Sequence, residues 1–342
     1  MASSYGAGTW SFLNMSSRLG NLMPVDRDEL IRLAAIHGFR EATLEKVIRL
    51  GEFLAQVGRH PVLRQVLLLK GGTALNLCFG PPLRLSVDLD FNYVGSQDRG
   101  VMLEQRPEVE RAVRRIAESQ DYRIQQSRDE HAGRKFYLGF QSSTGTPDRI
   151  EVDINYLHRV PLAPSSGLLL WQPGEFPRPR AAVVGIEELC AGKLCAMLDR
   201  ALPRDLYDVA HMGGIVGLNW RRGLLRSLFI ALAGTLPRPV YEYTIVRLER
   251  VTDRDIRSQL QPMLSSTDLT ESATSLRSAA WEAVAPLMPL TNYEREFIDR
   301  LQVGEITPAL LFPEDPGMAN RVARHPALLW KAQNARRAGG PR

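Results

Sequence analysis

Residues 69–91 read LKGGTALNLCFGPPLRLSVDLDF and combine a strand end, a Gly-Gly turn, a helix and a second strand in one short unit. In residues 84–91 apolar side chains alternate with Ser86, Asp88 and Asp90, which is the period of a half-buried strand. The two aspartates therefore point to the same side of the predicted strand. Carboxylates this close repel each other unless a cation lies between them, and Mg²⁺ prefers hard oxygen ligands. The pattern predicts a Mg²⁺ site, with a solvated strand face as the common alternative.

The glycines upstream of this strand lie between an apolar run, residues 66–69, and a helix-compatible stretch, residues 74–79. Free N–H groups and the dipole at a helix start attract phosphate, and glycine lets a triphosphate approach the backbone. A Gly-Gly turn alone often reflects simple geometry. Followed about sixteen residues later by Asp-x-Asp, it is typical of nucleotidyltransferases. We therefore expect the turn to bind a nucleotide through Lys70, Gly71, Gly72 and Thr73.

A third carboxylate is expected on a neighbouring strand. In residues 149–156, apolar residues alternate with Glu151, Asp153 and Asn155, so both acids share the polar face. We expect Asp153 to complete the metal site with Asp88 and Asp90. Glu151 is the second choice, and a solvated edge strand is the alternative for the whole segment.

Together these motifs resemble the AbiEii/AbiGii and MenT toxins, which are minimal nucleotidyltransferases. The resemblance spans nearly the whole chain from about residue 25 and is specific as a combination. The matching segments are KGGTAL at 70–75, RLSVDLDF at 84–91, EVD at 151–153, GIEELCAGKLCAMLDR at 185–200, PRDLYD at 203–208 and HPALLWKAQN at 325–334.

The resemblance implies roles for residues outside the strands. It places Lys193 on the nucleotide phosphates and Asp208 nearby, either orienting Lys193 or acting as a base. It also places Ser86 in the active site, where some of these toxins are phosphorylated by an antitoxin kinase. An exposed helical lysine is the alternative for Lys193. We expect Asp205 to be a local partner of Arg204 or a helix N-terminal acid.

The function implied by the resemblance is transfer of a nucleoside monophosphate from an NTP to RNA, with the 3′ end of tRNA as acceptor and a block of translation as the result. Two Mg²⁺ ions between Asp88, Asp90 and Asp153 would activate the 3′ hydroxyl and stabilise the pyrophosphate, the latter with help from Lys193. A cognate antitoxin is implied as a partner. Two alternatives stay open: transfer to a protein or small molecule, and a non-catalytic nucleotide-binding module, against which the three carboxylates argue.

The pattern of elements predicts an α+β chain of two lobes. We expect a flexible N-terminus over residues 1–25, a nucleotidyltransferase lobe of the polymerase-β kind over 26–185, and a helical lobe with a basic tail over 186–342. The site would lie in the cleft between the lobes. The expected elements are two amphipathic helices within 26–60, a helix at 104–119, strands at 122–127 and 135–140 that join a small mixed sheet, a loop at 161–179, and helices at 222–233, 240–251 and 292–302.

Charge favours an anionic partner beyond the nucleotide, since the formal net charge is +5 and the pI about 9.2. No acid follows Asp315, so the C-terminus is strongly cationic. We expect Lys331, Arg336 and Arg337 to contact the RNA backbone, with a disordered, solvated tail as the alternative for the last six residues. Trp330 is expected in the core.

Other features exclude several classes of protein. No apolar run approaches twenty residues, and residues 1–21 lack the pattern of a signal peptide, so we expect a cytoplasmic protein. The three cysteines, Cys78, Cys190 and Cys195, have no metal-ligand spacing. They are expected to be free buried thiols, and no zinc site is expected.

Overall fold

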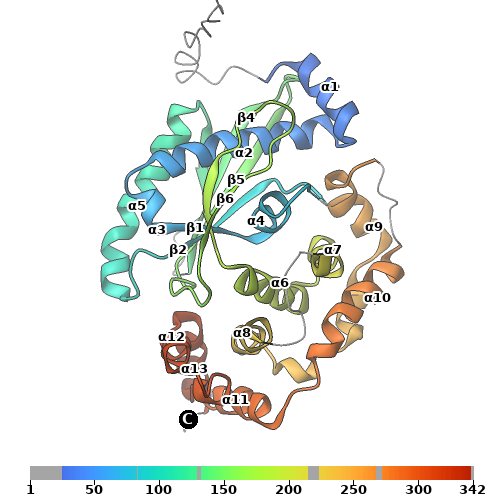
Figure 1. Cartoon of the computed structure of the whole chain (residues 1–342). Coiled ribbons are helices and arrows are strands. Elements are labelled where there is room, and N and C mark those ends of the chain that lie inside the picture. The colour runs from blue at the N-terminus through green and yellow to red at the C-terminus, as the bar shows by residue number, and fades with distance from the viewer. Residues whose placement is uncertain (1–24, 83, 129–131, 215–222, 267–271, 340–342) are drawn as a thin grey trace, which may run out of the picture.

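A mixed seven-stranded β-sheet forms the centre of the first lobe (Figure 1). The computed structural model describes residues 25–339 apart from 83, 129–131, 215–222 and 267–271, so the flexible N-terminus predicted for 1–25 lies almost wholly outside the described residues. The strands follow the order β3-β4-β5-β2-β1-β7-β6, with β2 parallel to β5 and β1 parallel to β7. Their bounds are β1 (Leu67–Lys70), β2 (Asp88–Tyr93), β3 (Arg123–Gln126), β4 (Gly133–Gln141), β5 (Pro147–Asn155), β6 (Ser166–Leu169) and β7 (Arg180–Val183).

One face of the sheet is covered by long helices. The first lobe contains α1 (Arg27–His37), α2 (Glu41–Arg59), α3 (Leu63–Val66), α4 (Gly71–Cys78) and α5 (Arg99–Ser119). Helix α2 buries one apolar stripe that includes Leu44 and Phe53, and it packs on β5 and β7. Strand residues such as Leu89 and Val152 are buried on the sheet. Because side chains alternate along a strand, the polar residues between these apolar ones, such as Asp88 and Asp153, face the other way, toward the second lobe.

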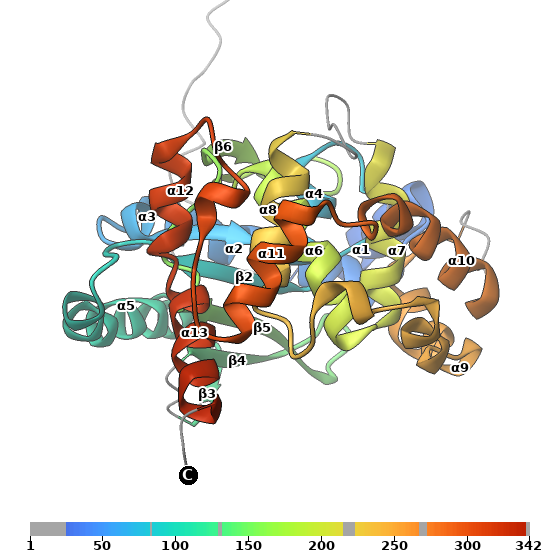
Figure 2. The ribbon, with the colours of Figure 1, turned by 90° about the horizontal axis from the view of Figure 1, so that it is seen from below.

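The second lobe is helical, as predicted. Helix α6 packs against α4, α7 and α8 and so lies next to the sheet (Figures 1 and 2). The α-helices are α6 (Ile186–Arg200), α7 (Pro203–His211), α8 (Leu224–Ala233), α9 (Asp253–Asp255), α10 (Ala273–Val284), α11 (Asn292–Gln302), α12 (Pro316–Ala323) and α13 (Pro326–Gly339). Short 3-10 helices are η1 (Met212–Gly214), η2 (Val240–Glu242), η3 (Ile245–Arg250), η5 (Gln261–Met263), η6 (Ala285–Leu287) and η7 (Pro308–Leu310), and η4 (Ile256–Leu260) is a π-helix.

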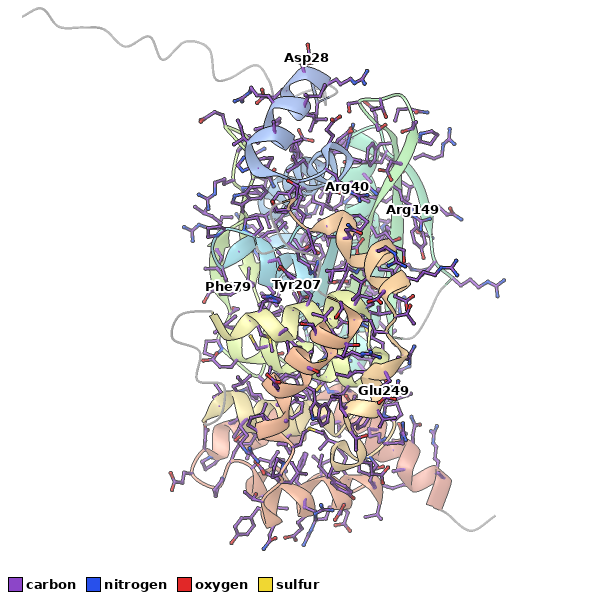
Figure 3. The ribbon with its side chains drawn as sticks, turned by 90° about the vertical axis from the view of Figure 1, so that its right-hand side faces the viewer. Asp28, Arg40, Phe79, Arg149, Tyr207 and Glu249 are labelled. Carbon is purple, nitrogen blue, oxygen red and sulfur yellow. The ribbon has the colours of Figure 1, made fainter. Side chains whose placement is uncertain are left out.

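The two lobes share one continuous hydrophobic core. A segment of the second lobe returns to the first, where the Ser266 N–H donates to the Gly38 carbonyl at 2.7 Å and the Thr43 hydroxyl donates to the Pro262 carbonyl at 3.0 Å. Figure 3 shows this side of the molecule, with Arg40 labelled beside the returning segment. The predicted lobe boundary at residue 185 therefore stays a prediction, because packing is continuous across it.

Several predicted elements differ from the observed ones. The predicted helix 240–251 is wrong, because this segment forms two 3-10 turns that follow Pro239. The loop predicted at 161–179 contains strand β6, whose four residues are too short and too exposed for a clear alternation. The predicted strand 84–91 begins only at Asp88. The helix predicted at 292–302 is confirmed as α11. Among the described residues, no helix is long and apolar enough to cross a membrane.

Candidate active site

Acidic side chains lie in register on two neighbouring strands of the sheet. Asp88 of β2 pairs with Glu151 of β5, and Asp90 pairs with Asp153. Neighbouring strands are about 4.8 Å apart, so the four carboxylates form a compact group on one face. The predicted convergence of the two acidic strands is therefore present, and it brings Glu151 to the group as well as Asp153.

Two lysines extend this row. Lys70 of β1 pairs with Asp90, and Lys135 of β4 pairs with Asp153, so a charged row crosses four strands, with the two acids in the middle and a lysine at each end. The Lys135 Nζ lies 3.4 Å from Glu151 Oε2 and 3.8 Å from Asp153 Oδ2. On the other side, Arg204 Nη1 of α7 lies 3.4 Å from Asp88 Oδ2. Cationic side chains thus hold three of the four carboxylates.

The carboxylates destabilise one another's charge. Burial raises the pKa of Asp88, and the charges of Asp90 and Glu151 raise it further against the opposing effect of Arg204. Burial and the charge of Asp90 likewise raise the pKa of Asp153, while Lys135 lowers it. A cation between the strands would relieve this repulsion.

The donor set fits a hard divalent cation, because it consists of carboxylate oxygens on one rigid sheet face. Asp88, Asp90 and Asp153 would hold such an ion. Within the described part of the chain, no three His, Cys, Asp or Glu side chains are already drawn together as metal ligands.

The Gly-Gly turn lies directly against the acidic strand. Gly71 has a φ of 75°, and a Cβ added there would collide with the Asp90 carboxylate. A Cβ at Gly72 would lie 2.9 Å from both Arg84 Nη2 and Ser86 Oγ. These glycines form the first residues of α4, whose free N–H groups are suited to phosphate. Only glycine combines this backbone conformation with so close an approach.

Thr73 and Ser86 have definite structural positions beside this turn. The buried Thr73 hydroxyl donates to the Asp88 carbonyl and so fixes the start of β2. Ser86 is 4% exposed and lies before β2, with its hydroxyl against Gly72. The Leu85 N–H donates to the Met263 carbonyl at 2.8 Å, so the second lobe holds the segment that carries Ser86. The prediction that Ser86 shares a strand with Asp88 is wrong.

A buried chain of ion pairs joins the turn to the second lobe. Arg84 donates to Asp208 through Nε at 2.8 Å and through Nη2 at 2.7 Å. Lys193 Nζ lies 2.6 Å from Asp208 Oδ2 and 3.2 Å from Asp205 Oδ1. Arg200 closes the chain with a 2.6 Å contact to Asp205. Burial alone would raise the pKa of Asp208, but the charges of Arg84 and Lys193 hold this pKa well below its usual range.

The buried ion pairs change several interpretations made from the sequence. Lys193 is 6% exposed, so the alternative of an exposed helical lysine is wrong. Its amine contacts two aspartates, and its predicted contact with phosphates stays a prediction. Asp205 lies in the first turn of α7 but pairs with Lys193 and Arg200, whereas Arg204 pairs with Asp88.

Four residues that contact acids of the site received no active-site role from the sequence: Arg84, Lys135, Arg204 and Asn76, whose amide donates to Asp208 Oδ1 at 3.0 Å. One signal could have found the first of them. Arg84 stands between Leu83 and Leu85 in the sequence. Such a setting favours burial, and a buried arginine requires an acidic partner.

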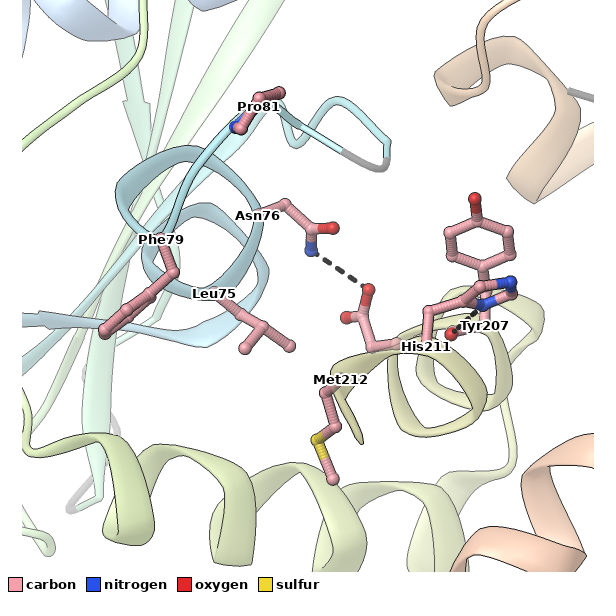
Figure 4. A pocket seen from close by; sticks show the side chains of 8 residues that line it. Leu75, Asn76, Phe79, Pro81, Tyr207, His211 and Met212 are labelled. Atoms are coloured by element: carbon pink, nitrogen blue, oxygen red, sulfur yellow. Dashed lines mark hydrogen bonds between the residues drawn. The ribbon is translucent and has the colours of Figure 1, made fainter. Parts of the chain in front are cut away.

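A small pocket of about 40 Å³ opens between α4 and α7 (Figure 4). Asp208 and Asn76 are among its lining residues, and the rings of Tyr207 and His211 stack with centroids 4.1 Å apart. Such a volume accommodates water rather than a nucleotide. The lining residues are Leu75, Asn76, Phe79, Pro81, Tyr207, Asp208, His211 and Met212.

The residues predicted to bind RNA lie on α13. Lys331 Nζ donates to the Leu236 carbonyl at 2.7 Å, and Arg336 Nε donates to the Gly304 carbonyl at 2.9 Å. Arg337 is exposed near the end of the helix. The prediction that Trp330 lies in the core is wrong, because 51% of this residue is exposed. The three cysteines are free thiols, as predicted, but only Cys190 is fully buried, whereas Cys78 and Cys195 are partly exposed.

Comparison with known proteins finds a matching family model and similar solved structures. The family model described as "Nucleotidyl transferase AbiEii toxin, Type IV TA system" matches residues 52–284, which include all four carboxylates and the buried ion-pair chain. MenT4, a nucleotidyltransferase toxin from Mycobacterium tuberculosis H37Rv, has a similar fold, with a TM-score of 0.55 and 20% sequence identity over 87% of this chain and 98% of that one. A search of the curated proteins finds no match.

Proposed function

Since this chain belongs to the AbiEii family of nucleotidyl transferase toxins of type IV toxin–antitoxin systems, we propose that it transfers a nucleoside monophosphate from an NTP to RNA. The proposed acceptor is the 3′ end of tRNA, whose modification would prevent aminoacylation and block translation. The proposal also includes action in the cytoplasm and neutralisation by a cognate antitoxin.

The observation that carries this proposal is the register of Asp88 and Asp90 with Glu151 and Asp153 beside the N-terminus of α4. An NTP whose phosphates approach Gly71 and Gly72 would have the same phosphates next to the carboxylates. A phosphate group and carboxylates repel each other, so the arrangement is productive only with cations between them. Mg²⁺ held by Asp88, Asp90 and Asp153 would supply that charge and activate the attacking hydroxyl.

The chain's own cations would share this task. Arg204 contacts Asp88 at 3.4 Å and is about one-third exposed, so it can turn to a phosphate oxygen when Asp88 binds a cation. Lys70 lies in the same row beside Asp90. We assign Lys193 and Asp208 mainly to positioning, because Asp208, which is paired with Lys193, holds Arg84 against the turn at Gly72. Ser86, packed at the same turn, would lie close to the phosphates.

The test is a transfer assay with purified protein, each radiolabelled NTP in turn, MgCl₂ and total tRNA. Label is expected on RNA with at least one NTP and is expected to disappear when EDTA is added. Label on the protein itself or on a small molecule would overturn the RNA acceptor. Absence of label from every fraction, with folded protein and all four NTPs, would overturn transfer.

A further inference from the structure

Helix α13 has one solvent face with an aromatic start and a cationic end. Its exposed residues include Leu329, Trp330, Gln333, Arg336 and Arg337, which recur at helical spacing. Leu329 is 46% exposed and Trp330 51% exposed, whereas Leu328 and Ala332 are fully buried on the opposite side. Two large adjacent apolar side chains on a fixed helix present a surface suited to a partner.

The helix is held rigidly in place. His325, directly before α13, is fully buried, and its ring packs edge-on against His158 with centroids 5.1 Å apart. The side chains of Lys331 and Arg336 donate to the carbonyls of Leu236 and Gly304. These contacts draw Lys331 away from the solvent face, on which the half-exposed Trp330 supplies an aromatic ring. A rigid aromatic platform loses little entropy when a partner stacks on it.

The start of this helix lies beside the strand that carries the catalytic acids. His158 comes shortly after Asn155, the last residue of β5, and Asp153 lies on the same strand. Since an α-helix rises about 1.5 Å per residue, Trp330 lies only about 7.5 Å from His325 along the axis of the helix. Figure 2 shows α13 following α12 and running toward the C-terminus. A strand of nucleic acid could therefore continue from the site along α13.

The charge of the surface selects an anionic partner. No Asp or Glu follows Asp315 in the sequence, while arginines flank the aromatic residue on both sides. Glu305, which follows the Gly304 contacted by Arg336, lies 3.7 Å from Arg300. Exposed aromatic rings combined with arginines are the usual means of binding single-stranded nucleic acid, because every base has a face that can stack.

We propose that the single-stranded 3′ end of the acceptor RNA docks along α13, with one base stacked on Trp330 and the backbone next to Arg337. This inference rests on the proposed function, since it names where that acceptor binds. It replaces a purely electrostatic contact through Lys331, Arg336 and Arg337 with a stacking platform followed by a cationic end.

The test measures binding and transfer separately. The probe is a short fluorescein-labelled single-stranded RNA ending in CCA, titrated by anisotropy over a salt series with the full chain. Trp330→Ala is expected to weaken binding about tenfold or more, while Trp330→Phe retains most of the affinity because a stacking ring remains. Arg337→Gln is expected to lower the salt dependence of binding, which Trp330→Ala leaves unchanged. The KM for total tRNA should rise in Trp330→Ala with an unchanged KM for NTP.

Tyr293→Ala is the matched control, because Tyr293 is a similarly exposed aromatic residue, on α11. Equal RNA affinity in wild type, Trp330→Ala and Tyr293→Ala would overturn the platform even if label is transferred to RNA. Self-association that disappears in Trp330→Ala, without a change in RNA affinity, would also overturn it in favour of a second copy as occupant. If wild type transfers no label to RNA, the proposed function fails, and the anisotropy series still decides whether Trp330 binds RNA.

Discussion

Asp208 is a fully buried carboxylate that accepts contacts from Arg84, Lys193 and Asn76. Replacing it with asparagine would leave two buried cations with one fewer negative partner. We expect Asp208→Asn to lower the free energy of unfolding by about 3–5 kcal/mol, the usual cost of breaking a buried ion pair. Urea unfolding followed by circular dichroism measures this change.

Asp199→Asn is the control, because Asp199 is an exposed acid on neighbouring α6. This variant should stay within about 0.5 kcal/mol of wild type. An Asp208→Asn protein as stable as Asp199→Asn would show that the ion-pair chain contributes nothing to holding the lobes.

Asp90 lies at the centre of the charged row, between Asp153 and Lys70. Asp90→Asn keeps the shape of the side chain but removes the charge that a cation requires, so transfer should fall by about a hundredfold or more. The melting temperature should not fall, because the variant removes the repulsion between Asp90 and the neighbouring carboxylates. Asp28→Asn, at the distant end of the first lobe in Figure 3, should retain full activity. Substantial transfer by folded Asp90→Asn would remove Asp90 from the site.

At this scale the sequence could predict which acids share a face but not which cations meet them. Alternation along a strand is local and fixes the sides of Asp88 and Asp153. The partners Arg204 and Lys135 come from other elements, and their positions depend on how the sheet and α7 pack. A lysine inside a helix likewise gave no sign that Lys193 would be buried between two aspartates.

Among the elements, the turn into α4 imposes the tightest local requirement. We expect Gly71→Ala to lower the free energy of unfolding by about 1 kcal/mol, because alanine resists the left-handed backbone conformation. The variant should also lose nearly all transfer activity, because the added Cβ displaces the Asp90 carboxylate. Gly145→Ala is a matched control, since Gly145 has a φ of 77° with open space around it. Thermal unfolding and the transfer assay on both variants separate the two effects. Equal activity of the two variants would show that the close approach to Asp90 has no role.

Elements with their own end signals could be predicted well. Helix α11 begins with a capping box formed by Thr291 and Glu294, and the predicted bounds, 292–302, match both of its ends. Helix α13 shows the opposite case. Its apolar run, residues 327–330, cannot all face inward on a helix, and packing against α11 and α12 decides that Leu328 is buried and Trp330 exposed. The phase of a short apolar run is set by its neighbours and cannot be read from the run alone.

In the whole molecule, His158 and His325 join the end of β5 to the start of α13 across the two lobes. Neither ring nitrogen of His325 has a hydrogen-bond partner among the described residues. Burial, together with the charge of Arg159, lowers the pKa of His325 to about 4. An unfolded histidine takes up its proton near pH 6.5, so between these two values the unfolded chain binds more protons than the folded protein. Acidification over this range therefore destabilises the fold.

We expect His325→Leu to be less sensitive to acid than wild type, because the variant has no imidazole to protonate at this contact. In wild type, His325 alone should lower the free energy of unfolding by up to about 1.4 kcal/mol for each unit by which the pH falls from 6.5 to 4. The measurement is urea unfolding of both proteins at pH 7.5, 6 and 5. No hydrogen bond is lost in the variant, so it should remain folded at neutral pH.

Glu52 provides the control, because acidification increases its contribution to stability, whereas it decreases that of His325. Burial raises its pKa from 4.5 to about 7, so the folded protein keeps a proton that the unfolded chain has lost, and this contribution weakens as pH rises through that interval. Glu52→Gln should therefore make the loss of stability on acidification steeper than in wild type, whereas His325→Leu should make it shallower. Parallel curves for wild type and His325→Leu would mean that this histidine does not resist protonation, and that the contact between the lobes is indifferent to its charge.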